Sequence, residues 1–76
     1  MALTTGETTW LGRVGLRIRL AHVSRGESQA QLGARADVSR VTVGSVERGD
    51  HPAATVYARI SRAIDLPLAD LLDGAP

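Results

Sequence analysis

Apolar residues recur every three or four positions along most of this chain, the spacing that places them on one face of an α-helix. The first such run spans residues 9–24 and is followed by Gly26, a residue type that commonly terminates helices. Ser28 is a good N-cap for a short helix over residues 29–36, and Asp37, which tolerates a positive φ, comes next. The first half of the chain is therefore predicted to contain two helices.

The segment VSRVTVGSVERG, residues 38–49, is rich in β-branched residues and by propensity could be an edge strand. It has no partner strand elsewhere in the chain, however, and a lone strand is not stable. Ser39 offers an N-cap, Val43 and Val46 lie three residues apart, and Gly49 provides a C-terminal stop. We therefore predict a third helix with Val43 and Val46 on its buried side.

Two more helices are predicted over residues 53–64 and 67–72, the second with Leu68, Leu71 and Leu72 facing inward. No strand is predicted, so the expected fold class is all-α, a compact bundle of five helices. A domain this small buries only about 60% of its unfolded surface, which leaves a thin core. The expected organisation is a flexible N-terminal arm, one helical domain and a flexible C-terminus, over residues 1–8, 9–73 and 74–76.

Composition narrows the classes of function. The chain has no cysteine, so neither a disulfide framework nor a thiolate metal site is expected. No stretch is apolar enough to span a membrane and no signal peptide is evident, which favours a cytoplasmic location. The net charge is only +1, yet residues 13–48 hold seven arginines against three acidic residues, while residues 49–76 hold two arginines against four aspartates. One half is therefore basic, the other acidic.

Residues 29–48 have the outline of a helix-turn-helix, and several short motifs accompany it. They are RIR at 17–19, RGESQ at 25–29, DVSRVTVGSVERG at 37–49, Pro52, and ARISRAIDLPLADLL at 58–72. Each is weak alone, but the ordered set resembles the Cro and phage-repressor type of helix-turn-helix domain, the XRE family. The resemblance implies a lambda-repressor-like bundle in which helices two and three form the motif, residues 28–48, and helix three enters the major groove of DNA.

The resemblance also implies which side chains contact DNA. Arg40, Val41 and Ser45 take the positions of base readers, with Arg40 suited to guanine, Val41 to a thymine methyl group, and Ser45 permissive. Gln29 is expected to bind a phosphate and to brace the first reader. The full set of expected DNA backbone contacts is Gln29, Ser39, Thr42 and Arg48. We expect Gly44 on the exposed side, where DNA can approach closely; the alternative is a glycine that avoids a clash with helix two.

One departure from the family affects the chemistry of the bundle. Relatives usually pair an arginine of helix one with a glutamate of helix three; here the glutamate is Glu47 and the arginine is replaced by His22. If the two pair, the carboxylate increases the proton affinity of the imidazole and makes the contact sensitive to pH. The alternative is a neutral histidine that is hydrogen-bonded in the core. Glu27, in place of an apolar residue, is expected to remove a small contact.

The first helix is apolar on two faces. Leu16, Leu20 and Val23 cluster opposite the predicted core residues, where relatives tend to carry charges. Two explanations remain open at this point. Either the N-terminal arm with Trp10 folds over this second face, or the face meets another protein chain.

The expected function is transcriptional regulation by sequence-specific binding of double-stranded DNA, as a repressor or small controller that acts as a homodimer on a pseudo-palindromic operator. By analogy, Leu68 and Leu71 are expected at the dimer surface. The alternative is a protein-interaction module, such as an antitoxin or anti-activator, that uses Leu16, Leu20 and Val23. No cofactor or metal is expected, and the lack of a paired-carboxylate pocket, a phosphate loop or metal-ligand spacing argues against an enzyme.

Overall fold

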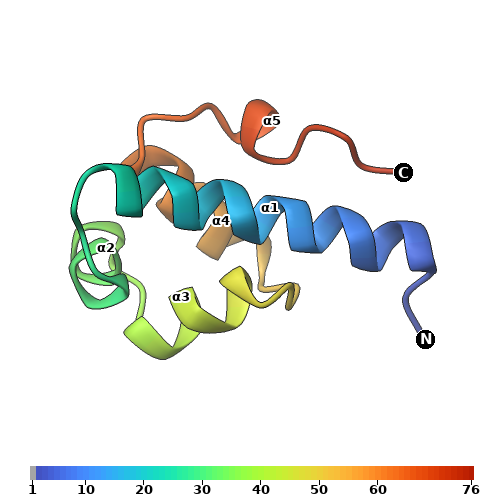
Figure 1. The fold of residues 1–76 in the computed structure, drawn as a ribbon, viewed down its shortest axis with the longest axis horizontal. Coiled ribbons are helices and arrows are strands. Elements are labelled where there is room, and N and C mark those ends of the chain that lie inside the picture. The colour runs from blue at the N-terminus through green and yellow to red at the C-terminus, as the bar shows by residue number, and fades with distance from the viewer. Residues whose placement is uncertain (1) are drawn as a thin grey trace.

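The computed structural model describes residues 2–76, and within this range the chain forms five helices connected by short loops and no strand (Figure 1). The helices are α1 (Thr5–Ser24), α2 (Gln29–Ala36), α3 (Arg40–Glu47), α4 (Ala54–Ala63) and α5 (Leu68–Leu71). The predicted all-α fold class is confirmed, and the valine-rich segment is helical, as predicted. Within the same residues, no helix combines the length and the apolar character that crossing a membrane requires.

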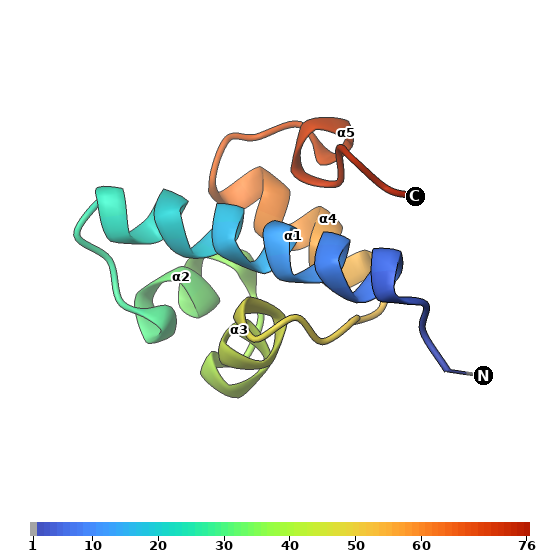
Figure 2. The same cartoon turned by 45° about the vertical axis from the view of Figure 1, so that its right-hand side comes forward.

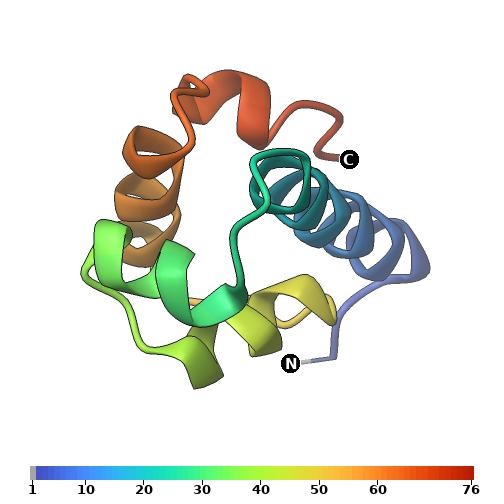
Figure 3. The ribbon, with the colours of Figure 1, turned by 60° about the vertical axis from the view of Figure 1, so that its left-hand side comes forward.

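α1 is the longest helix, and the other four are arranged around it. In Figure 1 it crosses the molecule with α5 on one side and α2 and α3 on the other, while α4 lies behind it. The turned views agree, and Figures 2 and 3 show α3 and α5 on opposite sides of α1. α3 packs mainly on α1 and α2, so its outer side is left without a neighbouring helix.

α1 begins four residues earlier than predicted, because a capping box holds its N-terminus. The Thr4 hydroxyl oxygen accepts from the backbone N–H of Glu7 at 3.1 Å, and Glu7 Oε1 accepts from the Thr4 N–H at 2.8 Å. These bonds satisfy two donors that lie outside the helical hydrogen-bond ladder. The expected flexible arm is therefore helical from Thr5.

The motif itself has the predicted local structure. The Ser28 hydroxyl caps α2, and Asp37 ends that helix with a φ of 57°. The Ser39 hydroxyl oxygen then accepts from the backbone N–H of Thr42 at 3.1 Å and so caps α3. Because the two caps and the left-handed residue fix both ends of the connection, the turn between α2 and α3 is short and well defined.

One cluster of buried apolar side chains joins all five helices. Val43 and Val46 of α3 belong to it, as predicted, together with Val14 and Ile18 of α1. The other members are Leu11, Leu32, Ala36, Tyr57, Ile60, Ile64 and Leu71. The thin core is thus shared by every element, and α3 is held in place by side chains that come from the whole chain.

α5 is attached to α1 by hydrogen bonds as well as by packing. The Trp10 indole N–H donates to Leu72 O at 3.0 Å, and Arg17 Nη1 donates to Leu71 O at 2.9 Å. Leu71 is fully buried, whereas Leu68 is 38% exposed, because a single turn of helix directs only part of its side chains to the core. The prediction that Leu68 faces inward is wrong, and so is the assignment of Leu71 to a dimer surface.

Glu27 has a larger role than the sequence suggested. Its carboxylate accepts two hydrogen bonds from the Arg35 guanidinium, both at 2.6 Å, across the joint between α1 and α2. These bonds hold the pKa of Glu27 below its usual value. The lost apolar contact is therefore replaced by a bidentate ion pair, which fixes the entry to the motif.

Candidate nucleic-acid interface

α3 has one buried face and one exposed face. Val43 is 0% exposed, whereas Val41, two positions earlier and so on the opposite side of the helix, is 69% exposed. Arg40 is exposed as well. Two of the three expected base readers therefore stand on an open protein surface, with no other helix over them.

Ser45, the third expected reader, is half-buried and has a partner that the sequence analysis missed. Its hydroxyl donates to Asp50 Oδ2 at 2.5 Å, and the backbone N–H of Asp50 donates to Ser45 O at 3.2 Å. Gly49, with a φ of 94°, makes the turn that brings the following residue back to the helix. The loop after α3 thus adds a carboxylate beside the reading face. An acidic residue directly after the predicted stop glycine was the available signal.

The N-terminus of α3 gathers two of the expected backbone contacts. The Ser39 hydroxyl accepts from the Thr42 N–H and donates to Thr42 Oγ1 at 2.8 Å. Thr42 Oγ1 accepts that proton, so its own hydroxyl proton stays available for an oxygen of a ligand. Arg48 lies exposed at the other end of α3. Polar donors therefore flank the exposed readers at both ends of the helix.

A buried polar cluster joins α1, α2 and α3. Glu47 Oε1 lies 2.6 Å from His22 Nε2, and Glu47 Oε2 accepts from the Gln29 side-chain amide. The side chains of His22 and Glu47 are 5% and 6% exposed. The structure thus brings together the two residues at the family's helix-one and helix-three positions, and adds Gln29 to them.

The hydrogen-bond geometry defines where protons lie in this cluster. His22 Nδ1 is 2.8 Å from Glu27 O, a carbonyl that can only accept, so Nδ1 carries a proton. The contact between His22 Nε2 and Glu47 Oε1 needs a second proton between the two atoms. A neutral imidazole would therefore require a protonated Glu47. The sensitivity of this contact to pH stays a prediction.

Gly44 faces α2 and not the outside. It is buried, and a Cβ at this position would lie 3.2 Å from Gln29 Oε1 and 3.3 Å from Arg48 Nη1. The prediction of an outward glycine that lets DNA approach is wrong. The alternative, a glycine that avoids a clash with α2, is confirmed. The absence of a side chain at Gly44 leaves space for the Gln29 side chain, which donates to Glu47.

A cavity of about 460 Å³ opens beside this cluster. Arg19 and Arg48 line it together with Ser28 and Gln29, the residues that start α2. Guanidinium groups next to the N-terminus of a helix suit a phosphate oxygen. Arg19 was not among the expected contacts, although it belongs to the RIR motif. Within residues 2–76, no three His, Asp or Glu side chains are grouped to hold a metal ion.

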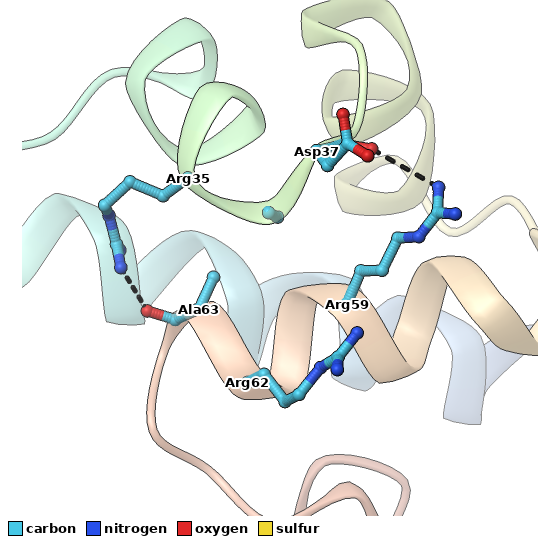
Figure 4. Close-up of a pocket in the computed structure, with 6 residues that line it drawn as sticks. Arg35, Asp37, Arg59, Arg62 and Ala63 are labelled. Carbon is cyan, nitrogen blue, oxygen red and sulfur yellow. Dashed lines mark hydrogen bonds between the residues drawn. The ribbon is translucent and has the colours of Figure 1, made fainter.

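A second set of arginines lies between α2 and α4 (Figure 4). A cavity of about 470 Å³ is lined there by Arg35, Arg59 and Arg62. Arg35, already paired with Glu27, also donates to Ala63 O, and Arg59 donates to Asp37 O at 3.4 Å. Both acceptors lie at helix C-termini, where the helix dipole favours cations. Arg35 and Arg59 therefore have structural partners in the free protein.

The second apolar face of α1 is open. Leu16, Leu20 and Val23 are 52%, 59% and 56% exposed. Trp10 does not cover them, because it packs against the core and is hydrogen-bonded beside α5. Of the two explanations left open by the sequence, coverage by the N-terminal segment with Trp10 is wrong.

Comparison with protein families gives a match of residues 17–71 to the model of the helix-turn-helix family. The matched range begins inside α1 and ends at the last residue of α5. It contains every expected DNA contact and both residues of the His22 and Glu47 pair. Comparison with curated proteins and comparison with solved structures gave no match.

Proposed function

This chain belongs to the helix-turn-helix family of the XRE type, and we propose that it is a transcriptional regulator that recognises a specific sequence of double-stranded DNA. The observation that carries the proposal is the open face of α3. Arg40 and Val41 are exposed on a helix whose opposite face is fully buried in the core. A helix that is fixed on one side and free on the other is suited to enter the major groove.

In this proposal the open face reads bases and its surroundings bind the backbone. Arg40 forks onto O6 and N7 of a guanine, and Val41 contacts a thymine methyl group. The Thr42 hydroxyl and the arginines around the cavity at the start of α2 contact phosphates, which position α3 without reading sequence. Gln29 lines the same cavity and donates to Glu47 through its side-chain amide, and the second N–H of that amide would donate to a phosphate.

We further propose that the protein represses or controls transcription as a homodimer on a pseudo-palindromic site. A single module of this size buries too little surface for tight specific binding, whereas a dimer on half-sites about one helical turn apart doubles the contacts. Because Leu71 lies inside the core, the dimer surface that we propose on α5 consists of Leu68 and its exposed neighbours.

Selection from random duplex DNA tests the proposal, because it returns the half-site, its spacing and its symmetry together. The selected site is then titrated with the wild type, Arg40→Ala and Arg62→Ala at two salt concentrations. Arg40→Ala should reduce the preference for the selected site over random DNA by roughly 5- to 150-fold. Arg62→Ala, a matched loss of one charge on α4, should leave that preference unchanged. A wild type with no preference, or equal losses on both DNAs for Arg40→Ala, contradicts the proposal.

A second candidate function is protein interaction, and the exposed face formed by Leu16, Leu20 and Val23 favours it. A module of this kind would act as an antitoxin or an anti-activator. Sedimentation of the wild type and of Leu20→Arg, without DNA, tests whether this face binds protein independently of DNA. Self-association that disappears in Leu20→Arg, together with unchanged DNA binding, supports a separate protein-binding face.

A further inference from the structure

We propose that Ser45 and Asp50 form a reading site that can only accept hydrogen bonds, and that this site selects the amino group of cytosine or adenine and disfavours guanine. The inference rests on the proposed DNA-binding function. It goes further than the permissive role that the family position suggests for Ser45, and it assigns a specificity role to a loop residue outside the helix-turn-helix.

The direction of one hydrogen bond carries the argument. A serine hydroxyl has a single proton, and in this structure Ser45 gives it to Asp50 Oδ2 at 2.5 Å. A carboxylate has no proton to give back. What remains on the pair is therefore a set of lone pairs on Ser45 Oγ and on the two oxygens of Asp50, with no donor among them.

The pair is held in a fixed position next to the exposed readers. Ser45 lies one helical turn after Val41 and so on the same side of α3. The loop is attached to the helix by the Asp50 N–H on Ser45 O at 3.2 Å and by the Gly49 N–H on Val46 O at 3.0 Å. Asp50 takes part in none of the ion pairs formed within residues 2–76, so no protein cation neutralises its charge.

The major-groove edges of the bases decide which partner fits. Cytosine presents an N4 amino donor and adenine an N6 amino donor, whereas guanine presents only the acceptors O6 and N7. Placing guanine against the pair would face acceptors with acceptors and leave desolvated oxygens unpaired. A DNA phosphate is excluded for the same reason.

The inference also gives a spacing. Arg40 and Ser45 are five residues apart, which is about 7.5 Å along an α-helix. That distance corresponds to about two base-pair steps of roughly 3.4 Å. We therefore expect a half-site with a guanine read by Arg40 and, about two base pairs away, a cytosine or adenine read by Ser45 and Asp50.

Binding-site selection with the wild type, Asp50→Asn and Asp73→Asn tests this. The wild type should prefer cytosine or adenine over guanine at the second position by at least about fivefold. Asp50→Asn supplies an amide donor and should accept guanine there, with the preference at the Arg40 position unchanged. Asp73→Asn removes an equal charge after α5, near the C-terminus, and should leave the preferences at both positions unchanged. Circular dichroism confirms that each variant is folded.

Two outcomes separate this inference from the proposed function. A preference that depends on Arg40 but stays the same at every position in Asp50→Asn, with uniformly tighter binding, shows that the carboxylate only repels DNA and overturns the inference alone. If the wild type has no sequence preference and Arg40→Ala does not change its DNA binding, both the inference and the proposed function are overturned. Ser45→Ala provides a second check, since the carboxylate alone should keep guanine disfavoured.

Discussion

The two ends of α3 are held in very different ways. At its C-terminal end, the carbonyl groups of Val46 and Glu47 lie so close to α1 that a Cβ on Gly15 would come within 2.5 and 2.8 Å of them. At its N-terminal end, the Ser39 hydroxyl caps the first turn and a Cβ on Gly33 of α2 would clash with the Val38 carbonyl, yet Val41 is 69% exposed. The C-terminal end is clamped between two other helices, whereas the N-terminal end, though held against α2, leaves the side chains of Arg40 and Val41 open to solvent.

This difference indicates that, within the eight residues of α3, some residues fix the helix and others are free to contact DNA. The orientation of a reading helix must be fixed to within about half an ångström, while its reading side chains must stay uncovered. Fixing the helix from its buried side satisfies both demands, because the buried Glu47 and the close approaches at Gly15 and Gly33 leave the Arg40 side chain exposed. Substitutions at the clamped end should therefore lower stability, and those at the open end should change recognition.

The largest effect is expected for Glu47→Ala, which removes the anion shared by α1, α2 and α3. His22 Nε2 and the Gln29 amide would then be left buried without their acceptor. Removing one partner of a buried pair costs about 3 kcal/mol or more in the free energy of unfolding. Urea denaturation measures this, with Arg48→Ala, the exposed neighbour, expected within about 0.5 kcal/mol of the wild type. Equal stability of the two variants would show that the cluster does not hold α3.

Gly15→Ala should have the next largest effect, because its new methyl group meets backbone carbonyls that cannot rotate away. Overpacking of this kind costs about 1–3 kcal/mol. Gly12→Ala is a matched control three residues earlier on the same helix, where a Cβ would have no neighbour within 4 Å. That variant should gain up to about 1 kcal/mol from helix propensity. Thermal unfolding of the two variants would move in opposite directions; a shift in the same direction contradicts the close approach.

The contrast between these two glycines shows where sequence reasoning stops. Both lie in one predicted helix, and helical spacing does not distinguish the glycine that contacts α3 from the one that contacts solvent. Caps and periodicity are local, so they predicted Asp37 in a left-handed conformation and Val43 and Val46 on the buried side. The approach of two backbones distant in sequence depends on packing that no local pattern encodes.

The candidate site divides in the same way. The outward positions of Arg40 and Val41 were implied by the resemblance to the family, whereas the orientation of Gly44 and the partner of Ser45 depended on neighbours outside α3. The N-terminal cap of α1 is a different case. Thr4 and Glu7 form a readable T-x-x-E motif, and it was hidden only because threonine and glycine around it suggested flexibility.

Two valines on α3 sharpen the comparison at a smaller scale. Val43→Ala removes two buried methyl groups and should destabilise by about 1.5 kcal/mol, since the lost burial exceeds the gain in helix propensity. Val41→Ala removes the same groups from solvent and should change stability by about 0.5 kcal/mol or less. DNA titration should give the reverse order, with loss of preference at a thymine only for Val41→Ala. Similar unfolding curves for the two variants would mean that the faces of α3 are assigned wrongly.

The smallest effect is expected at the entry to the motif and depends on pH. The guanidinium of Arg35 holds the pKa of Glu27 below its usual value of 4.5. A carboxyl whose pKa is lower in the folded state adds stability above the unfolded pKa and loses it as the pH falls through the folded pKa. Glu27→Gln keeps the backbone carbonyl that accepts from His22 and changes only the side chain. The free energy of unfolding should therefore fall less steeply below pH 4.5 in Glu27→Gln than in the wild type, and Arg35→Ala should show the same shallower slope. Parallel pH profiles for all three proteins would mean that this ion pair adds nothing to the anchoring of α2, and that α3 is positioned by the buried cluster and the core alone.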